Sequence, residues 1–259
     1  MIKFPLIELL DKRSLIIHFS WMNIKLRFKG SYLGLIWAGL EPLLMFLILF
    51  VVFSSIREIP QENFGIYLIT GVLFYHLFSR GTSTGLVSLK VNSSILKSFK
   101  IKKELFPVIA TATTCILLFV ELGVLFGLMP IFEFTPGWNI VFLPVLLILF
   151  LLLVLGINYI LSVLYVYVKD VQPFWTIFVY ALLFVSPIFW YTSEVEGILL
   201  NIQKINPFGQ LVEMAHKIIV FNENPTITEW FSTTIIVFGI LFIGFIMFKK
   251  LEGKIVERL

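Results

Sequence analysis

The chain has 259 residues, of which 59% are hydrophobic and only 14% are charged, and its formal net charge is +4. No soluble domain of this length buries so much apolar surface, so the composition excludes a soluble enzyme or binding module and indicates several membrane crossings. The single cysteine, Cys115, lies within an apolar run, which excludes a disulfide framework.

Residues 1–34 are predicted to form an amphipathic helix in the membrane interface. Two apolar seams, one from Leu15 to Leu26 and one from Ile17 to Phe28, alternate with polar and basic residues. Helices with tryptophan and basic residues at the level of the lipid headgroups typically lie in the plane of the membrane. A cytoplasmic helix packed against the bundle fits the same pattern, and this alternative stays open.

Residues 35–259 are predicted to form one permease domain, which makes the protein an all-α integral membrane protein with six transmembrane helices. The predicted spans cover residues 35–56, 64–79, 105–129, 140–168, 171–191 and 230–248. Most Lys and Arg then lie on one side of the membrane, which predicts that both termini are cytoplasmic. The semi-polar segment 192–229 is broken by two Asn-Pro pairs. It therefore predicts short external re-entrant helices between spans five and six.

Two acidic residues and one histidine fall within the predicted spans. Glu41 precedes Pro42, and this pair is interpreted as a kink near the interface, with a functional role as the less favoured alternative. His76 is interpreted as a polar residue that is satisfied inside the bundle. An ionised carboxylate at mid-membrane costs at least about 2.5 kcal/mol. Glu121 is therefore expected to face protein or a water-filled cavity, or to be protonated.

Residues 80–104 are predicted to form a cytoplasmic segment between spans two and three. Small polar residues fill its first part, and lysines then surround apolar residues at helical spacing. This pattern indicates a basic amphipathic helix that docks onto a cytoplasmic partner. A loop that only orients the protein in the membrane is the alternative.

Several catalytic and transport motifs are absent from the sequence. It contains no Gly-x4-Gly-Lys-Ser/Thr phosphate loop, no His-Glu-x-x-His and no Gly-x-Ser-x-Gly. Its three histidines are too far apart in sequence for metal-ligand spacing. An ion-coupled transporter usually carries more polar residues at the membrane midplane. A translocation subunit remains, which is not an enzyme and needs no cofactor because a separate ATPase binds the ATP.

Four stretches carry a resemblance to a known family: residues 27–44 (RFKGSYLGLIWAGLEPLL), 92–107 (NSSILKSFKIKKELFP), 167–171 (YVKDV), and 186–191 (SPIFWY) with Asn206-Pro207. In this order and spacing they resemble the polysaccharide-exporting ABC permeases, the type-two permeases for O-antigen, teichoic acid and capsule. The sequence departs from the family pattern at Lys169 and Val171, where the family has Arg and Leu. This departure affects the side-chain detail of that turn.

The resemblance implies a homodimer that binds two copies of an ABC ATPase subunit. Such a complex would move a lipid-linked polysaccharide outward across the plasma membrane, in contact with membrane lipids and with no nucleic acid partner. The resemblance also implies a coupling helix around residues 83–94 and an external gate in residues 193–221. Two alternatives stay open: a type-two permease for drugs or small lipids, and a membrane enzyme that acts on polyprenyl-linked substrates.

Candidate site residues follow from this chemistry. A diphosphate headgroup needs cations near the lipid headgroups, although these cations could serve only to orient the chain. The candidates for the headgroup are Lys25, Arg27, Lys29 and Tyr32. Sugar chains need aromatic faces and hydrogen-bonding groups, and the candidates for the translocation pathway are Trp37, Glu41, Phe46, Phe50, Tyr67, Phe74 and Tyr75.

The remaining candidates follow from the resemblance alone. The residues expected at the ATPase contact are Ser83, Leu86, Val87, Leu89, Lys90, Val91, Asn92 and Lys97. The residues expected at the external gate are Pro187, Asn206 and Pro207.

Overall fold

The computed structural model describes residues 12–56, 63–99 and 101–258, and every regular element within these ranges is a helix. In chain order the elements are α2 (Arg13–Arg27), α3 (Ile36–Ile56), α4 (Phe64–Val91), α5 (Ser93–Ser98), α6 (Leu105–Leu128), η1 (Trp138–Phe142), α7 (Leu143–Tyr167), α8 (Val171–Val185), η2 (Thr192–Glu194), α9 (Ile198–Ile205), α10 (Pro207–Ile219), α11 (Ile227–Leu251), η3 (Glu252–Lys254) and α12 (Ile255–Arg258). The first eleven residues of the predicted interface helix lie outside the described ranges.

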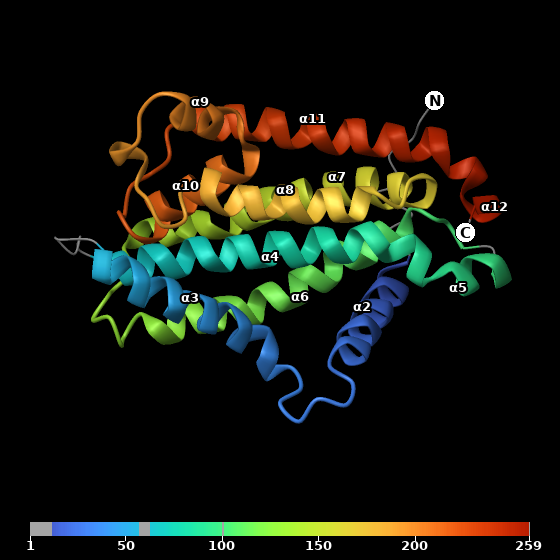
Figure 1. Ribbon diagram of the computed structural model, residues 1–259, viewed down its shortest axis with the longest axis horizontal. Helices are drawn as coiled ribbons and strands as arrows, with labels where there is room; N and C mark the ends of the chain where they lie inside the picture. The colour runs from blue at the N-terminus through green and yellow to red at the C-terminus, as the bar shows by residue number, and fades with distance from the viewer. Residues whose placement is uncertain (1–11, 57–62, 100, 259) are drawn as a thin grey trace.

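The long helices run side by side along the longest axis of the molecule (Figure 1). Helix α7 packs against both α11 and α4, and α4 packs against α6. Helices α2 and α3 lie on one side of this bundle, with α2 against α6 and α3 against α4 and α6. Helices α5 and α12 lie at one end of the bundle, while α9 lies at the opposite end.

Four helical segments among the described residues are long and apolar enough to cross a membrane: Ile36–Ser55, Leu105–Leu128, Trp138–Tyr167 and Ile227–Arg258. The protein is therefore a multi-pass integral membrane protein. Helix α8 is apolar but has only 15 residues, and the 28-residue helix α4 carries charged and polar side chains along its second half.

The helix that contains the second predicted span continues beyond the end of that span. The sequence places a span at residues 64–79 and a cytoplasmic segment from Arg80 onward, but α4 continues without a break to Val91. The side chain of Arg80 is buried, with only 4% of its surface exposed, and it pairs with carboxylates from two other helices. These carboxylates compensate its charge, so Arg80 can lie inside the bundle.

The helix of the fifth predicted span ends before that span does. Helix α8 ends at Val185, whereas the sequence places the end of this span at residue 191. Ser186, the residue before Pro187, is extended, with a ψ of 152°. Proline disfavours the helical conformation for the residue before it, and this effect ends the helix.

Local sequence sets several other helix starts. Pro107 lies in the first turn of α6, and Pro144 lies at the start of α7, where a missing backbone N–H costs no hydrogen bond. Thr226 and Glu229 form a capping box at the start of α11. Glycine then sets the closest packing, because an added Cβ at Gly156 of α7 would lie 2.8 Å from the backbone of Leu241 in α11.

Candidate functional site: a basic, polar groove between α2, α4 and α6

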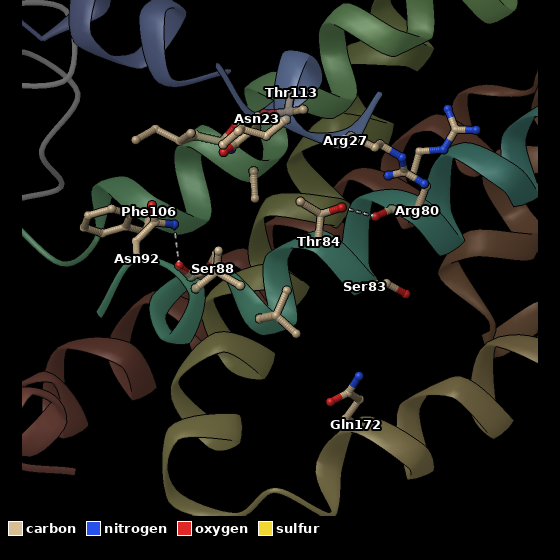
Figure 2. Close-up of a pocket in the computed structure, with 15 residues that line it drawn as sticks. Asn23, Arg27, Arg80, Ser83, Thr84, Ser88, Asn92, Phe106, Thr113 and Gln172 are labelled. Carbon is tan, nitrogen blue, oxygen red and sulfur yellow. Dashed lines mark hydrogen bonds between the residues drawn. The ribbon is translucent and has the colours of Figure 1, made fainter. Parts of the chain in front are cut away.

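A groove of about 430 Å³ opens between α2, α4 and α6, with one residue from the start of α8 (Figure 2). Its lining consists of Asn23, Leu26, Arg27, Arg80, Ser83, Thr84, Val87, Ser88, Val91, Asn92, Phe106, Ile109, Ala110, Thr113 and Gln172. Two of these residues are arginines, several carry hydroxyl or amide groups, and none of the fifteen is acidic.

Helical spacing explains why α4 supplies the floor of this groove. Arg80, Ser83 and Thr84 are followed by three further lining residues at positions 87, 88 and 91. These positions recur every three or four residues, so they share one face of the helix. The prolonged α4 therefore carries a polar stripe that a helix ending at residue 79 could not present.

Helix α2 forms the wall of the groove, and a buried serine attaches it to α6. The hydroxyl of Ser20 lies 3.2 Å from the carbonyl oxygen of Ile109 and 2.8 Å from that of Ile16 within its own helix. Ser20 is fully buried. This contact holds the last turn of α2, and with it Arg27, over the groove.

Two arginines, Arg27 and Arg80, line the groove, and Glu41 and Glu121 compensate the charge of Arg80. Partial burial and the neighbouring Arg80 guanidinium lower the pKa of Arg27 from its ordinary value, although Glu41 and Glu121 oppose this change. Two like charges that disfavour each other attract an anion more strongly than either charge alone. The groove therefore suits a group that combines negative charge with hydrogen-bonding oxygens, such as a phosphate or diphosphate next to a sugar.

Behind the groove, Arg80 joins a cluster that includes Glu41 from α3, Glu121 from α6 and His76 from its own helix. The Nη1 of Arg80 donates to the Oε1 of Glu121 at 3.1 Å, and its Nη2 donates to the Oε2 of Glu41 at 3.0 Å. The side chain of Glu121 is fully buried, whereas 57% of the Glu41 side chain is exposed. The cluster ties three helices together at one level of the bundle.

One tautomer of His76 fits its contacts with Arg80 and Glu121, while its Nε2 also lies 3.4 Å from the Oε1 of Glu41. An arginine nitrogen can only donate, so the Nε2 of His76 accepts from the Nη2 of Arg80 at 3.1 Å. The other ring nitrogen, Nδ1, then carries hydrogen and donates to the Oε1 of Glu121 at 3.1 Å. The interpretations of His76 as a satisfied residue and of Glu121 as facing protein agree with this arrangement.

Sequence reasoning missed Arg80, which was placed at a span border. The signal that could have found it is its spacing, because Arg80 follows His76 by four residues and so shares one helix face with an intramembrane polar residue. Two acidic residues elsewhere in predicted spans, Glu41 and Glu121, then needed a buried cation as partner.

The predicted headgroup residues lie at the end of α2 and in the turn that follows it. Arg27 lines the groove, whereas Lys25, Lys29 and Tyr32 are exposed and do not line it. Of the four, the structure therefore brings only Arg27 together with a second cation. The role of the other three in headgroup binding stays a prediction.

Four of the predicted pathway residues are buried inside the protomer: Phe46, Tyr67, Phe74 and Tyr75. The ring of Tyr67 stacks on His216 with centroids 3.6 Å apart, and Phe74 meets Phe150 edge-on at 5.3 Å. A side chain that touches a passing polymer has to reach a surface or a cavity. These four residues pack in the core of this conformation, and their contact with a polymer stays a prediction.

The other predicted pathway residues are more accessible. Trp37 is 39% exposed, Phe50 is half-buried, and Glu41 belongs to the charged cluster. Trp37 and Glu41 lie in the first two turns of α3, one turn apart on the same helix. Their contact with a polymer stays a prediction.

The residues predicted to contact the ATPase divide into three groups. Leu86 and Leu89 are buried, at 2% and 0% exposure, so they do not lie on the surface of this conformation, and their contact with the ATPase stays a prediction. Ser83, Val87, Val91 and Asn92 line the groove instead, because α4 extends through this segment. Lys90 and Lys97 are exposed, and Lys97 lies in α5 at the end of the bundle.

The three predicted gate residues lie where α8, α9 and α10 meet. Asn206 caps α10 by accepting from the backbone N–H of Phe208, and its Nδ2 donates to the hydroxyl of Ser186 at 3.0 Å. Pro207 is the first residue of α10, and the carbonyl oxygen of Pro187 accepts from the hydroxyl of Tyr67. The structure thus brings these residues together, and their gating role stays a prediction.

Comparison with known proteins gives the family of the chain. The profile of the family described as "ABC-2 type transporter" matches residues 14–220. The chain is 22% identical over 240 residues to the O-antigen export system permease protein RfbA of Klebsiella pneumoniae, covering 92% of each chain. It is 24% identical over 189 residues to the protein of the same name in Myxococcus xanthus, covering 73% of each.

A relative from another export system has a similar identity. The polysialic acid transport protein KpsM of Escherichia coli is 25% identical over 242 residues, which are 89% of this chain and 90% of that protein. The family match includes α2, the groove and the charged cluster, and it extends to the end of α10. With its helical bundle and its apolar spans, the chain belongs to the ABC-2 type transporter family.

Proposed function

We propose that this protein is the permease subunit of an ABC exporter that moves a lipid-linked polysaccharide outward across the plasma membrane. The observation that carries this proposal is the groove between α2, α4 and α6, where two arginines face hydroxyl and amide groups and no acidic residue lines the wall. A polyprenyl diphosphate sugar presents the complementary chemistry, because its phosphates need cations and its sugar needs hydrogen-bond partners.

The names of the relatives support the class of cargo. Proteins named for O-antigen export and for polysialic acid transport align with most of this chain. The shared feature of these cargoes is a long sugar polymer. The proposal extends this class to the present chain and leaves the individual polymer open.

The proposed topology has six spans with both termini in the cytoplasm. Helix α4 has 28 residues and measures about 42 Å at 1.5 Å per residue, which suffices to cross a bilayer including its headgroups. Helix α8 with its apolar continuation to residue 191 forms the other additional span, so α9 and α10 lie on the external side. Lysines near α5 and at the end of α11 support a cytoplasmic position for the opposite end.

In the proposed assembly, two copies of the chain bind two copies of an ATPase subunit. Helix α5 at the cytoplasmic end, with exposed Lys97 and Phe99, is the candidate contact with the ATPase. Apolar packing connects α5 to the bundle, because Leu96 belongs to the same buried cluster as Phe106 and Phe248. A push on α5 would therefore reach both α6 and α11.

In this mechanism, α2 admits the substrate. The diphosphate would enter the groove from the level of the headgroups and bind between Arg27 and Arg80, while the polyprenyl tail stays in the lipid. The hydroxyl and amide groups of α4 would then contact the first sugars. ATP binding by the partner subunits would drive the polymer to the external side, where α9 and α10 meet the end of α8.

A matched pair of substitutions tests the headgroup role. Arg27→Gln removes a groove cation, whereas Lys250→Gln removes an exposed cation in the last turn of α11 that does not line the groove. We expect Arg27→Gln to lower the amount of polymer at the cell surface at least about tenfold, as for loss of a charge-assisted contact, while Lys250→Gln retains export. Equal export by both variants at equal membrane levels would contradict the proposal.

The assembly is tested separately by purification of the tagged protein from host membranes in mild detergent. We expect a stoichiometric ATPase subunit to copurify, and we expect Lys97→Glu to weaken that association because it reverses the charge of the exposed α5. Recovery of the permease alone under conditions that keep membrane complexes intact would refute the exporter proposal.

A further inference from the structure

One cation of the groove is already paired with a carboxylate from outside the groove. Arg80 lines the groove, yet its Nη2 donates to Glu41 at 3.0 Å and its Nη1 donates to Glu121 at 3.1 Å. Only 4% of the Arg80 side chain is exposed. The guanidinium is thus fixed in place with a carboxylate on each side.

The two carboxylates differ in burial. Glu121 is fully buried and also accepts from His76, so it is a permanent partner of Arg80. Glu41 has 57% of its side chain exposed, so the protein does not enclose it. Of the two carboxylates, Glu41 is therefore the one that a competing anion can displace.

Arg80 also retains an unused donor. Its Nε is buried and has no hydrogen-bond partner in the described part of the chain. A guanidinium presents Nε and an Nη as one edge that can bind two oxygens of the same anion. In this structure the carboxylates accept from Nη1 and Nη2, while the Nε of Arg80 has no acceptor in the described part of the chain. A buried donor without an acceptor costs free energy, and a phosphate oxygen that accepted from the Nε would remove that cost.

We infer that Arg80 is an anion-binding residue of the groove and that Glu41 occupies the place of the substrate's phosphate when the groove is empty. This inference rests on the proposed function and adds a second binding residue and an internal competitor to it. The ligand is a phosphate-bearing group such as a polyprenyl diphosphate. Glu121 and His76 are positioning residues that hold the guanidinium toward the groove.

The competition has a mechanical consequence, because Glu41 belongs to α3 and Arg80 to α4. When a phosphate takes the Nη2 of Arg80, Glu41 of α3 loses its ion pair with Arg80 and keeps the longer contact of 3.4 Å with the Nε2 of His76. Helix α3 follows a turn in which Gly30 and Gly34 have positive φ values of 82° and 54°. An added Cβ at either glycine would meet no atom within 4 Å, so the turn has free space around it. Substrate binding would thus loosen the side of the bundle that α2 and α3 form.

The experiment measures equilibrium binding of radiolabelled farnesyl diphosphate to the purified permease–ATPase complex in detergent without nucleotide. Farnesol, which has the same tail and no phosphate, is the control ligand. Glu41→Gln removes the competing charge and keeps a side chain of similar size. We expect it to tighten binding roughly fivefold, the change that corresponds to loss of an ion pair worth about 1 kcal/mol.

Removal of Arg80 requires a compensated variant, because a buried glutamate without its cation destabilises the fold. The double variant Arg80→Gln with Glu121→Gln removes the cation and its buried counter-charge together. We expect it to weaken farnesyl diphosphate binding at least about tenfold, with farnesol binding unchanged. Lys204→Gln, a change of an exposed cation in α9 outside the groove, should leave both affinities unchanged.

The possible outcomes separate the inference from the proposed function. A Glu41→Gln complex that binds farnesyl diphosphate no more tightly than the wild type would overturn the competition. A double variant with unchanged affinity would remove Arg80 from the site. If either result occurs while the wild type still prefers farnesyl diphosphate to farnesol, only this inference fails. A wild type without that preference would overturn both the inference and the headgroup role.

Discussion

The packing between α7 and α11 allows a quantitative prediction, because glycine permits the close approach of these helices. An ideal Cβ at Gly156 would lie 2.8 Å from both the N and the Cα of Leu241. Carbon atoms in ordinary contact are about 3.5–4.0 Å apart, so Gly156→Ala requires the two helices to separate by roughly 0.7 Å or more. Backbone atoms cannot rotate away as a side chain can, so the two helices have to shift as bodies.

We expect Gly156→Ala to lower the free energy of unfolding by about 1–3 kcal/mol, the usual cost of overpacking a tight interior. The assay is denaturation in a fixed detergent, followed by tryptophan fluorescence and far-UV circular dichroism. Gly239→Ala in α11 is the control, because an added Cβ there meets no atom within 4 Å. It should retain wild-type stability or gain slightly from the higher helix propensity of alanine. Gly156→Ala with a stability equal to that of Gly239→Ala would refute the packing argument.

Three further predictions concern buried polar contacts and use the same unfolding assay. Glu121→Leu leaves the buried Arg80 without its inner carboxylate and should lower the free energy of unfolding by about 3–5 kcal/mol. Glu121→Gln keeps an acceptor and should lower it clearly less. Equal losses in the two variants would contradict a role for the acceptor. Asn158→Ala removes the hydrogen bond from Nδ2 to the Oγ1 of Thr111 at 3.0 Å and should lower the free energy of unfolding by about 1 kcal/mol. In a protein that already carries Thr111→Val, the same substitution should have no such effect. Tyr67→Phe removes a hydroxyl donor that lies within hydrogen-bonding distance of two backbone carbonyls after α8. We expect it to lower the free energy of unfolding by about 1–2 kcal/mol. A variant as stable as the wild type would show that those carbonyls find other partners.

The charged cluster also explains how Arg80 can lie inside the bundle in the middle of α4. A guanidinium at position 80 would end a membrane span if lipid surrounded it, and sequence reasoning placed a boundary there for that reason. Inside the bundle, Glu121 and Glu41 compensate the charge, and the helix continues for eleven residues beyond Arg80 to Val91. The polar stripe that follows Arg80 then becomes the floor of the groove.

Local patterns were sufficient for much of the fold. The apolar runs placed α3, α6 and α11 within a few residues of their observed ends, because hydropathy and proline position act along the chain itself. The motif order likewise predicted the family that the profile match shows. The end of α8 was missed, because the apolar residues after Pro187 continue the hydropathy signal although the proline ends the helix.

The sequence by itself determined that the chain is a helical membrane protein, which stretches are apolar enough to span, and to which family it belongs. Only the tertiary structure decided which side chains share a site. Arg27, Arg80 and Thr113 come from three helices, and the carboxylates on Arg80 come from α3 and α6. Hydropathy is a property of residues that are neighbours in the sequence. An ion pair or a groove depends instead on how helices that are far apart in the sequence are rotated about their axes and shifted along them relative to one another. That information arises only when the helices pack.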